Sequence, residues 1–150
     1  MKISTRGRYG VRAMFELAKN YGSYPVPVKK ISQHQEIPLP YLERILNGLN
    51  KAKLVYSVRG PGGGFTLARR PEGIKIIDII SVLEESISPV FCVDASEKNQ
   101  CKRVNGCIAH LLWKKLDKKI REVLEGTTLK DLCEWEKELS STAEDYIPYP

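Results

Sequence analysis

Catalytic side chains and long apolar runs are scarce in this chain. It has two histidines, His34 and His110, and neither lies in a recognisable pattern with a serine or cysteine nucleophile. No segment approaches the roughly 18 consecutive apolar residues of a membrane-spanning helix. Met1 is followed by Lys2 and polar residues instead of the apolar stretch of a secretory signal. The sequence therefore predicts a cytoplasmic protein that is neither an enzyme nor bound to a membrane.

The chain also has fewer acidic residues than basic ones. Of the 150 residues, 24 are lysine or arginine and 18 are aspartate or glutamate, so the formal net charge is +6. Hydrophobic residues make up 42%, which is enough for one globular domain of ordinary size. A basic surface suits an anionic partner such as nucleic acid, although many mildly basic proteins have no such partner.

The first 50 or so residues have the pattern of a helix-turn-helix. Apolar residues at three- and four-residue steps predict a helix over 5–20, and a break at 22–27 separates it from a short helix over 28–35. Pro40 suits the first turn of a third helix. The apolar face of that helix is Tyr41, Leu42, Ile45, Leu46 and Leu49, and its opposite face is Glu43, Arg44, Asn47, Asn50 and Lys51. A short helix, a tight turn and a longer helix with a polar face are typical of DNA-binding modules.

A β-hairpin is predicted directly after the third helix. Strand-like residues at 54–58 and 65–68 flank Arg59-Gly60-Pro61-Gly62-Gly63-Gly64, and Arg69 and Arg70 follow. A phosphate-binding nucleotide loop is excluded because its glycines open into a helix, whereas these open into a strand. A hairpin after a recognition helix is a wing, so we expect a mainly α fold with a small β-wing.

The second half is predicted to be helical on both sides of a long loop. Helices are expected over 74–84, over 107–124 and from about 128 to 139, and no periodicity occurs from 86 to 106. The apolar stripe of the long helix, which packs either on the core or on a second copy, is Leu112, Leu116, Ile120, Val123 and Leu124. The expected parts are a winged helix-turn-helix domain (1–72), a linking helix and loop (73–106), a dimerisation helix with a C-terminal helix (107–140) and a tail (141–150).

Three of the four cysteines and one histidine are concentrated at this loop, in the order Cys92-x8-Cys101-x5-Cys107-x2-His110. Reduced thiols in the cytoplasm favour metal or redox chemistry over disulfides. This donor set can bind zinc, a [2Fe–2S] cluster, or a [4Fe–4S] cluster that takes one further ligand. The spacing lacks the paired C-x2-C turns of common zinc sites and favours iron–sulfur, while zinc and free redox-active thiols stay open as alternatives. Cys133 fits a small buried apolar side chain.

Four segments carry a resemblance to a known family. Residues 1–10, Tyr41-Leu42-Glu43, Val58-Arg59-Gly60-Pro61-Gly62-Gly63-Gly64-Phe65 and Cys107-Ile108-Ala109-His110-Leu111-Leu112-Trp113 resemble the Rrf-type bacterial transcription regulators. Within this family, the last segment is most similar to the IscR type, the iron–sulfur cluster regulators. The similarity extends over roughly residues 1–135.

The resemblance implies a homodimeric repressor of promoters for cluster-assembly genes, with a [2Fe–2S] cluster on Cys92, Cys101, Cys107 and His110. It implies that the long late helices cross between subunits. It also implies that Arg59 enters the minor groove of DNA and that Glu43 and Arg44 face the major groove, where a carboxylate accepts well from a cytosine amine. The candidate DNA-binding residues are Pro40, Tyr41, Glu43, Arg44, Asn47, Lys51, Arg59, Gly60, Pro61 and Gly62.

The sequence departs from its relatives at the loop. The gap of eight residues after Cys92 is longer than in the IscR type. NsrR-type regulators, which sense nitric oxide, hold a [4Fe–4S] cluster with three cysteines and a carboxylate from the partner's first helix. Here that stretch has Arg6 and Arg8 and no carboxylate before Glu16, which favours His110 as the fourth ligand. CymR-type relatives lack the cysteine loop. A nitric-oxide or redox sensor and a zinc-stabilised DNA-binding protein are therefore the alternative functions.

Overall fold

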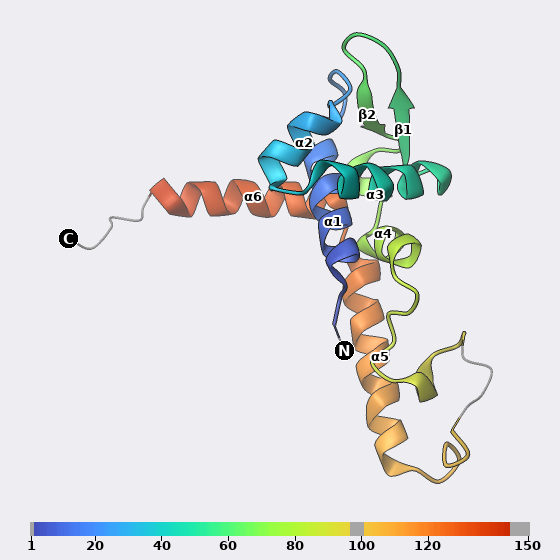
Figure 1. The fold of residues 1–150 in the computed structure, drawn as a ribbon. Helices are drawn as coiled ribbons and strands as arrows, with labels where there is room; N and C mark the ends of the chain where they lie inside the picture. The colour runs from blue at the N-terminus through green and yellow to red at the C-terminus, as the bar shows by residue number, and fades with distance from the viewer. Residues whose placement is uncertain (1, 97–100, 145–150) are drawn as a thin grey trace.

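The structure is a computed structural model, and it describes residues 2–96 and 101–144 (Figure 1). The helices are α1 (Thr5–Lys19), α2 (Val28–Gln35), α3 (Leu39–Lys51), α4 (Ile76–Leu83), α5 (Ile108–Gly126) and α6 (Leu129–Glu144). Two short 3-10 turns occur at Pro71–Gly73 (η1) and Phe91–Val93 (η2). Strands β1 (Val55–Val58) and β2 (Gly64–Leu67) form one antiparallel pair. The prediction of a mainly α fold with a small β-wing is confirmed.

The wing is built as its glycines predict. Residues Val55 and Leu67 face each other at the base of the hairpin, and Val58 faces Gly64 at its far end. Gly60 and Gly62 have φ angles of 93° and 74°, a left-handed conformation that side chains with a Cβ rarely adopt. These two glycines therefore allow the tight turn that carries Arg59 out into solvent.

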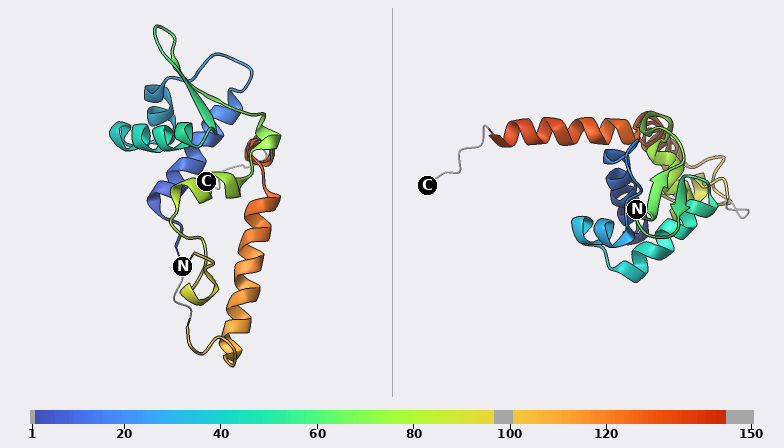
Figure 2. Two further views of the ribbon diagram at one scale, coloured as in Figure 1. Left: turned by 90° about the vertical axis from the view of Figure 1, so that its right-hand side faces the viewer. Right: turned by 90° about the horizontal axis from the view of Figure 1, so that it is seen from above.

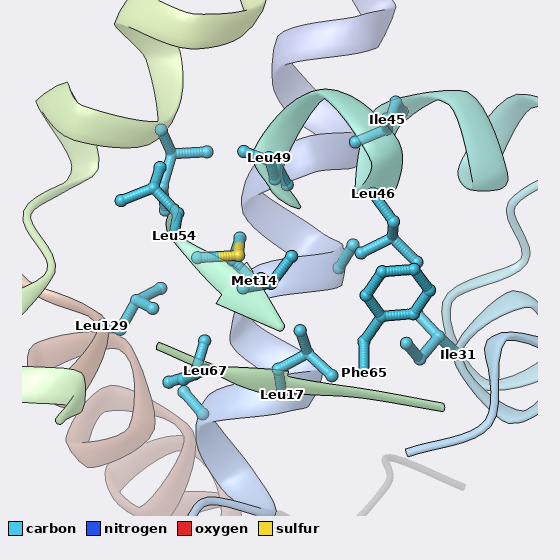
Figure 3. Close-up of a cluster of buried hydrophobic side chains, with 14 of the residues drawn as sticks. Met14, Leu17, Ile31, Ile45, Leu46, Leu49, Leu54, Phe65, Leu67 and Leu129 are labelled. Atoms are coloured by element: carbon cyan, nitrogen blue, oxygen red, sulfur yellow. The ribbon is translucent and has the colours of Figure 1, made fainter. Parts of the chain in front are cut away.

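One hydrophobic core joins the helix-turn-helix, the wing and the start of the last helix (Figure 3). Met14 and Leu17 of α1 lie at its centre, with Leu46 of α3 and Phe65 of β2 beside them. Leu129, the first residue of α6, is fully buried in the same cluster. The residues after 107 are thus attached to the N-terminal half through a shared core.

A short backbone pairing fixes that attachment. Lys75 forms an isolated antiparallel bridge with Thr128, the amide of Ile76 donates to the carbonyl of Thr127 (2.9 Å), and the amide of Leu129 donates to the carbonyl of Ile74 (3.0 Å). Because these residues are extended, α4 begins at Ile76 and not at 74 as the periodicity predicted. This pairing holds the turn between α5 and α6 against the residues that lead into α4.

The last two helices extend away from this core. α5 contains no buried residue, and it runs beside the segment that holds the cysteines (Figure 1). α6 leaves the body of the molecule at a steep angle to α5 (Figures 1 and 2). It continues to Glu144, beyond the end predicted near 139, so the first residues assigned to the tail are helical. In the described parts of the chain, no helix has the length and apolar character needed to cross a bilayer.

Candidate cluster site and nucleic-acid interface

The four predicted ligands line one pocket of about 310 Å³ between η2 and the start of α5. Cys92 lies in η2, Cys101 in the following loop, Cys107 is the N-cap residue of α5, and His110 is in its first turn. All four side chains are half-buried. The remaining walls are mostly apolar and consist of Val90, Phe91, Val104 and Trp113. Segments that are separated by up to 18 positions in the sequence therefore converge at one place.

Local backbone structure positions these side chains. The amide of His110 donates to the carbonyl of Cys107 (3.2 Å), so both lie in one turn at the start of α5 and face the same pocket. The amide of Val104 donates to the carbonyl of Cys101 (3.2 Å), which makes a turn after that cysteine. Nδ1 of His110 lies 3.3 Å from Sγ of Cys92. The prediction that Cys107 and His110 share a face is confirmed.

The donor set fits a soft metal centre. Three thiols and an imidazole are the ligands that iron–sulfur clusters and zinc take from proteins. Apolar walls limit the access of water, which helps to tune such a centre. In the parts of the chain that the structure describes, no three or more His, Cys, Asp or Glu side chains are close enough together to hold one metal ion. The fit thus lies in the donor types and in their shared pocket.

Polar contacts around the pocket tie the loop to itself and to α5. Asp94 accepts hydrogen bonds from the hydroxyl of Ser86 and from the amide (2.8 Å) and hydroxyl (2.6 Å) of Ser96. These hydrogen bonds, that from Ser86 first, hold the pKa of Asp94 below its usual value. Arg121 of α5 donates to the hydroxyl of Ser88 (3.3 Å). These residues were not predicted from the sequence, because a serine or an arginine in a loop or on a helix surface has no distinctive pattern.

The candidate DNA-binding residues gather at the other end of the molecule. Figure 1 shows α3 and the wing at the end opposite the cysteine loop. Nine of the ten candidates are exposed: Pro40, Glu43, Arg44, Asn47, Lys51, Arg59, Gly60, Pro61 and Gly62. Tyr41 is half-buried, and its ring packs edge-on against that of Tyr9, with centroids 5.7 Å apart.

Cys133 and His34 lie outside the candidate cluster pocket. Cys133 packs against the core but is half-buried, and burial raises the pKa of its thiol. His34 is in the last turn of α2. It is half-exposed, yet its ring bonds to the buried carboxylate of Glu16 (2.9 Å). Nothing in the local pattern could have indicated this contact, since its partners are 18 residues apart.

A winged helix-turn-helix with an exposed polar recognition helix defines the class of DNA-binding transcription regulators. The chain belongs to the Rrf2 family, described as iron-dependent transcriptional regulator, which matches residues 3–135. It is 39% identical over 132 residues to IscR of Sodalis glossinidius, covering 88% of this chain and 78% of that protein. It is 42% identical over 135 residues to CymR of Bacillus subtilis, covering 90% and 91%. The chain is therefore a transcriptional regulator and not an enzyme.

Solved structures of the same two kinds of protein share the fold. The structure of B. subtilis CymR matches with a TM-score of 0.75 and 40% identity, over 90% of this chain and 98% of that one. The structure of T. potens IscR matches with a TM-score of 0.71 and 39% identity, over 100% and 94%. Both similarities confirm the Rrf-type winged helix-turn-helix that the sequence motifs predicted.

Proposed function

We propose that the chain is an iron–sulfur cluster-responsive repressor of genes for cluster assembly, which binds a [2Fe–2S] cluster through Cys92, Cys101, Cys107 and His110. The observation that carries the proposal is the convergence of these four donors on one pocket. Similarity to IscR proteins over most of the chain supports it. The proposal places the protein in the cytoplasm, where its thiols stay reduced.

The proposed active form is a homodimer. Leu111, Leu112 and Val123 of α5 are each more than half exposed, although their apolar surface favours burial. A second pocket, of about 500 Å³, lies at the other end of the same helix between Ile3, Ile87 and Ile120. A second copy packed along α5 would cover both. Helix-turn-helix proteins usually bind as two-fold dimers to half-sites about 34–36 Å apart, or a multiple of that, so a dimer suits the proposed DNA binding.

The proposed DNA contacts divide between the two grooves. The exposed face of α3 would read base edges in the major groove through Glu43, Arg44 and Asn47, because a helix fits there and its side chains reach the bases. Lys51 would contact phosphate, since it lies at the end of the helix and carries a positive charge. Arg59 would enter the minor groove, whose negative potential attracts arginine.

The chain's own contacts suggest how the two ends communicate. When bound, the cluster would supply a link that oxidants, nitric oxide or iron shortage can break. With that link, Cys92 and Cys101 hold the loop against Cys107 at the start of α5. The far end of α5 is joined to α4 by the pairing of residues 74–76 with 127–129, and α4 packs on α1. A few kcal/mol of differential affinity along this route is enough to change promoter binding.

The test is anaerobic purification with an absorption spectrum and assays of iron and acid-labile sulfide. We expect equal amounts of both, in the stoichiometry of one [2Fe–2S] unit per protomer. Alanine at Cys92, Cys101 or Cys107 should abolish the chromophore, and alanine at His110 should shift it. Cys133→Ala is the matched control and should keep the wild-type spectrum, because Cys133 lies in α6 away from the pocket. A colourless protein with stoichiometric zinc, or a [4Fe–4S] spectrum, would contradict this assignment.

A cluster-free regulator is the second candidate. The match to B. subtilis CymR, the global cysteine regulator, covers 90% of this chain, against 88% for IscR of Sodalis glossinidius. On this alternative the four donors would stay free, and promoter binding would be unchanged when iron is removed. Binding assays with the iron-loaded and the chelator-treated protein separate the two candidates.

A further inference from the structure

Glu16 is buried in a place where an ionised side chain costs free energy of folding. Among the residues that the structure describes, it is the charged one that is buried, with 2% of its surface exposed. A buried carboxylate is tolerated only when it is paired and hydrogen-bonded. It lies on α1 between Phe15 and Leu17, in a helix whose other buried residues are apolar or glycine. The hydrogen-bond partners of Glu16 therefore explain why it can be buried.

Two of those partners are the last two residues of α2, the first helix of the helix-turn-helix. Nδ1 of His34 donates to Oε1 of Glu16 (2.9 Å), and Nε2 of Gln35 donates to Oε2 (2.8 Å). Both carboxylate oxygens are thereby engaged by one helical turn. Ile31 of α2 is fully buried and Val28 is partly buried against the core, so apolar packing holds this short helix at few points.

Arg12, one turn earlier on α1, completes the contact with α2. Its guanidinium donates to the backbone carbonyl of Gln35 and to the side-chain oxygen of that residue (Nε–Oε1, 3.3 Å). The next residue, Glu36, has a φ of 53°, a left-handed conformation that is unfavourable for a residue with a Cβ. The turn from α2 into α3 is therefore held from α1 at the point where the chain changes direction.

The same carboxylate is connected to α6. Nζ of Lys19 lies 3.3 Å from Oε2 of Glu16 and 3.3 Å from Oε1 of Glu136. α6 packs against α1 here, and it follows directly from the corner at the end of α5 (Figure 1). One buried group is thus in contact with the DNA-reading module and, through Lys19, with the C-terminal helix.

We propose that Glu16 is a positioning residue for DNA recognition, which holds the last turn of α2, and with it the turn into α3, in one orientation against α1 and α6. Specific binding needs α3 to present its side chains to base edges in register, whereas contacts to phosphates tolerate small rotations. The inference rests on the proposed reading of DNA by α3 and is independent of a cluster.

The experiment compares two duplexes, one selected by the wild-type chain from a randomised pool and one unselected, by fluorescence anisotropy over a range of salt concentrations. Glu16→Gln keeps the size of the side chain and removes its charge. We expect about tenfold weaker binding to the selected duplex and less than about a twofold change for the unselected one, with the same salt slope. Equal losses on both duplexes, in step with a lower melting temperature, would show a merely structural role and overturn the proposal.

Further variants keep the test decisive if Glu16→Gln does not fold. His34 is half-exposed, so His34→Ala should fold and should lose specificity in the same direction by about threefold to fivefold. On α6, Glu136→Gln removes the contact with Lys19, and Glu138→Gln is the matched control because it changes the charge equally at an exposed position. We expect a loss of specificity for the first and none for the second. Wild-type discrimination by both His34→Ala and Glu136→Gln would refute the proposal.

Discussion

At the scale of single residues, α1 depends on a side chain from the end of α4. Glu84 accepts hydrogen bonds from the amide (2.8 Å) and the hydroxyl (2.6 Å) of Ser4, the N-cap residue of α1. A carboxylate at this end of a helix is favoured by the helix dipole. Gly7 makes room for it, because a Cβ there would lie 2.2 Å from Oε1 of Glu84. The loop that holds the cysteines thus follows a residue that is hydrogen-bonded to the N-cap of the first helix.

The stability of the protein should depend on the ionisation of Glu16. Burial opposes its charge, but hydrogen bonds from His34, Gln35 and Lys19 outweigh burial and hold its pKa below the ordinary value. In the unfolded chain Glu16 takes up a proton near pH 4.3, where the folded protein does not. Its contribution is therefore present above that pH and is lost as the pH falls through the folded pKa.

We expect Glu16→Gln to flatten the acid limb of the stability curve, measured as the urea midpoint between about pH 6 and 3. At neutral pH the variant should be less stable by about 1–3 kcal/mol, since it loses charge-assisted hydrogen bonds in a buried place. Glu138→Gln, an exposed carboxylate, should leave the wild-type slope intact. Parallel slopes for wild type and Glu16→Gln would show that the network does not control acid stability.

At the scale of helices and strands, local patterns predicted most of the fold. The bounds of α2 were predicted to the residue, and the glycines at 60 and 62 indicated the wing, because periodicity and turn chemistry are local properties. The start of α4 was wrong by two residues because it depends on a pairing with residues 127–129. The candidate ligands were indicated by their rare residue types.

Two of the contacts that the sequence pattern did not indicate join residues very far apart in the chain. The salt bridge of Lys19 with Glu136 joins residues 117 positions apart, and the hydrogen bond of Ser4 with Glu84 joins residues 80 apart. Charged and polar side chains at such positions look like an ordinary solvated helix surface in the sequence. Only the packing of α1 against α4 and α6 brings them together.

The second prediction concerns the proposed dimer contact along the long helix α5. Val123 is 65% exposed in one protomer, so a polar substitution there should cost a single protomer little. Buried against a second copy, a carboxylate would lose its hydration without a partner. We expect Val123→Glu to shift the protein from dimer to monomer in sedimentation experiments, while its far-UV circular dichroism stays as in wild type.

The control for this prediction is Lys118→Gln, which changes the net charge by the same amount on the solvated part of α5. The Lys118 side chain is 76% exposed, and its ion pair with Glu122 is long, at 4.0 Å. This variant should remain dimeric. A dimer of unchanged strength in Val123→Glu would place the interface on another surface.

At the scale of the whole molecule, the candidate sensor and the candidate DNA-reading surface lie at opposite ends (Figures 1 and 2). The cysteine pocket and the wing share no residue, and α4, α5 and α1 stand between them. Loss of a ligand should therefore change DNA binding indirectly, through the orientation of the modules. Direct readout by α3 and the wing can be tested on its own.

Arg59 and Lys51 should have different roles in DNA binding, although each carries one positive charge on an exposed side chain. Arg59→Ala should weaken binding to a selected duplex by about 1–3 kcal/mol, because an arginine in the minor groove senses groove shape and potential. Lys51→Ala should weaken selected and unselected duplexes alike and lower the salt slope by about 1, as expected when one phosphate contact is lost. Both effects are measured by anisotropy titrations at several salt concentrations. Lys130→Ala removes the same charge from α6, which is part of neither α3 nor the wing, and should change neither quantity. Wild-type affinity of Arg59→Ala for the selected duplex would remove the wing from the DNA-binding surface, since an arginine that reads the groove cannot be lost without cost.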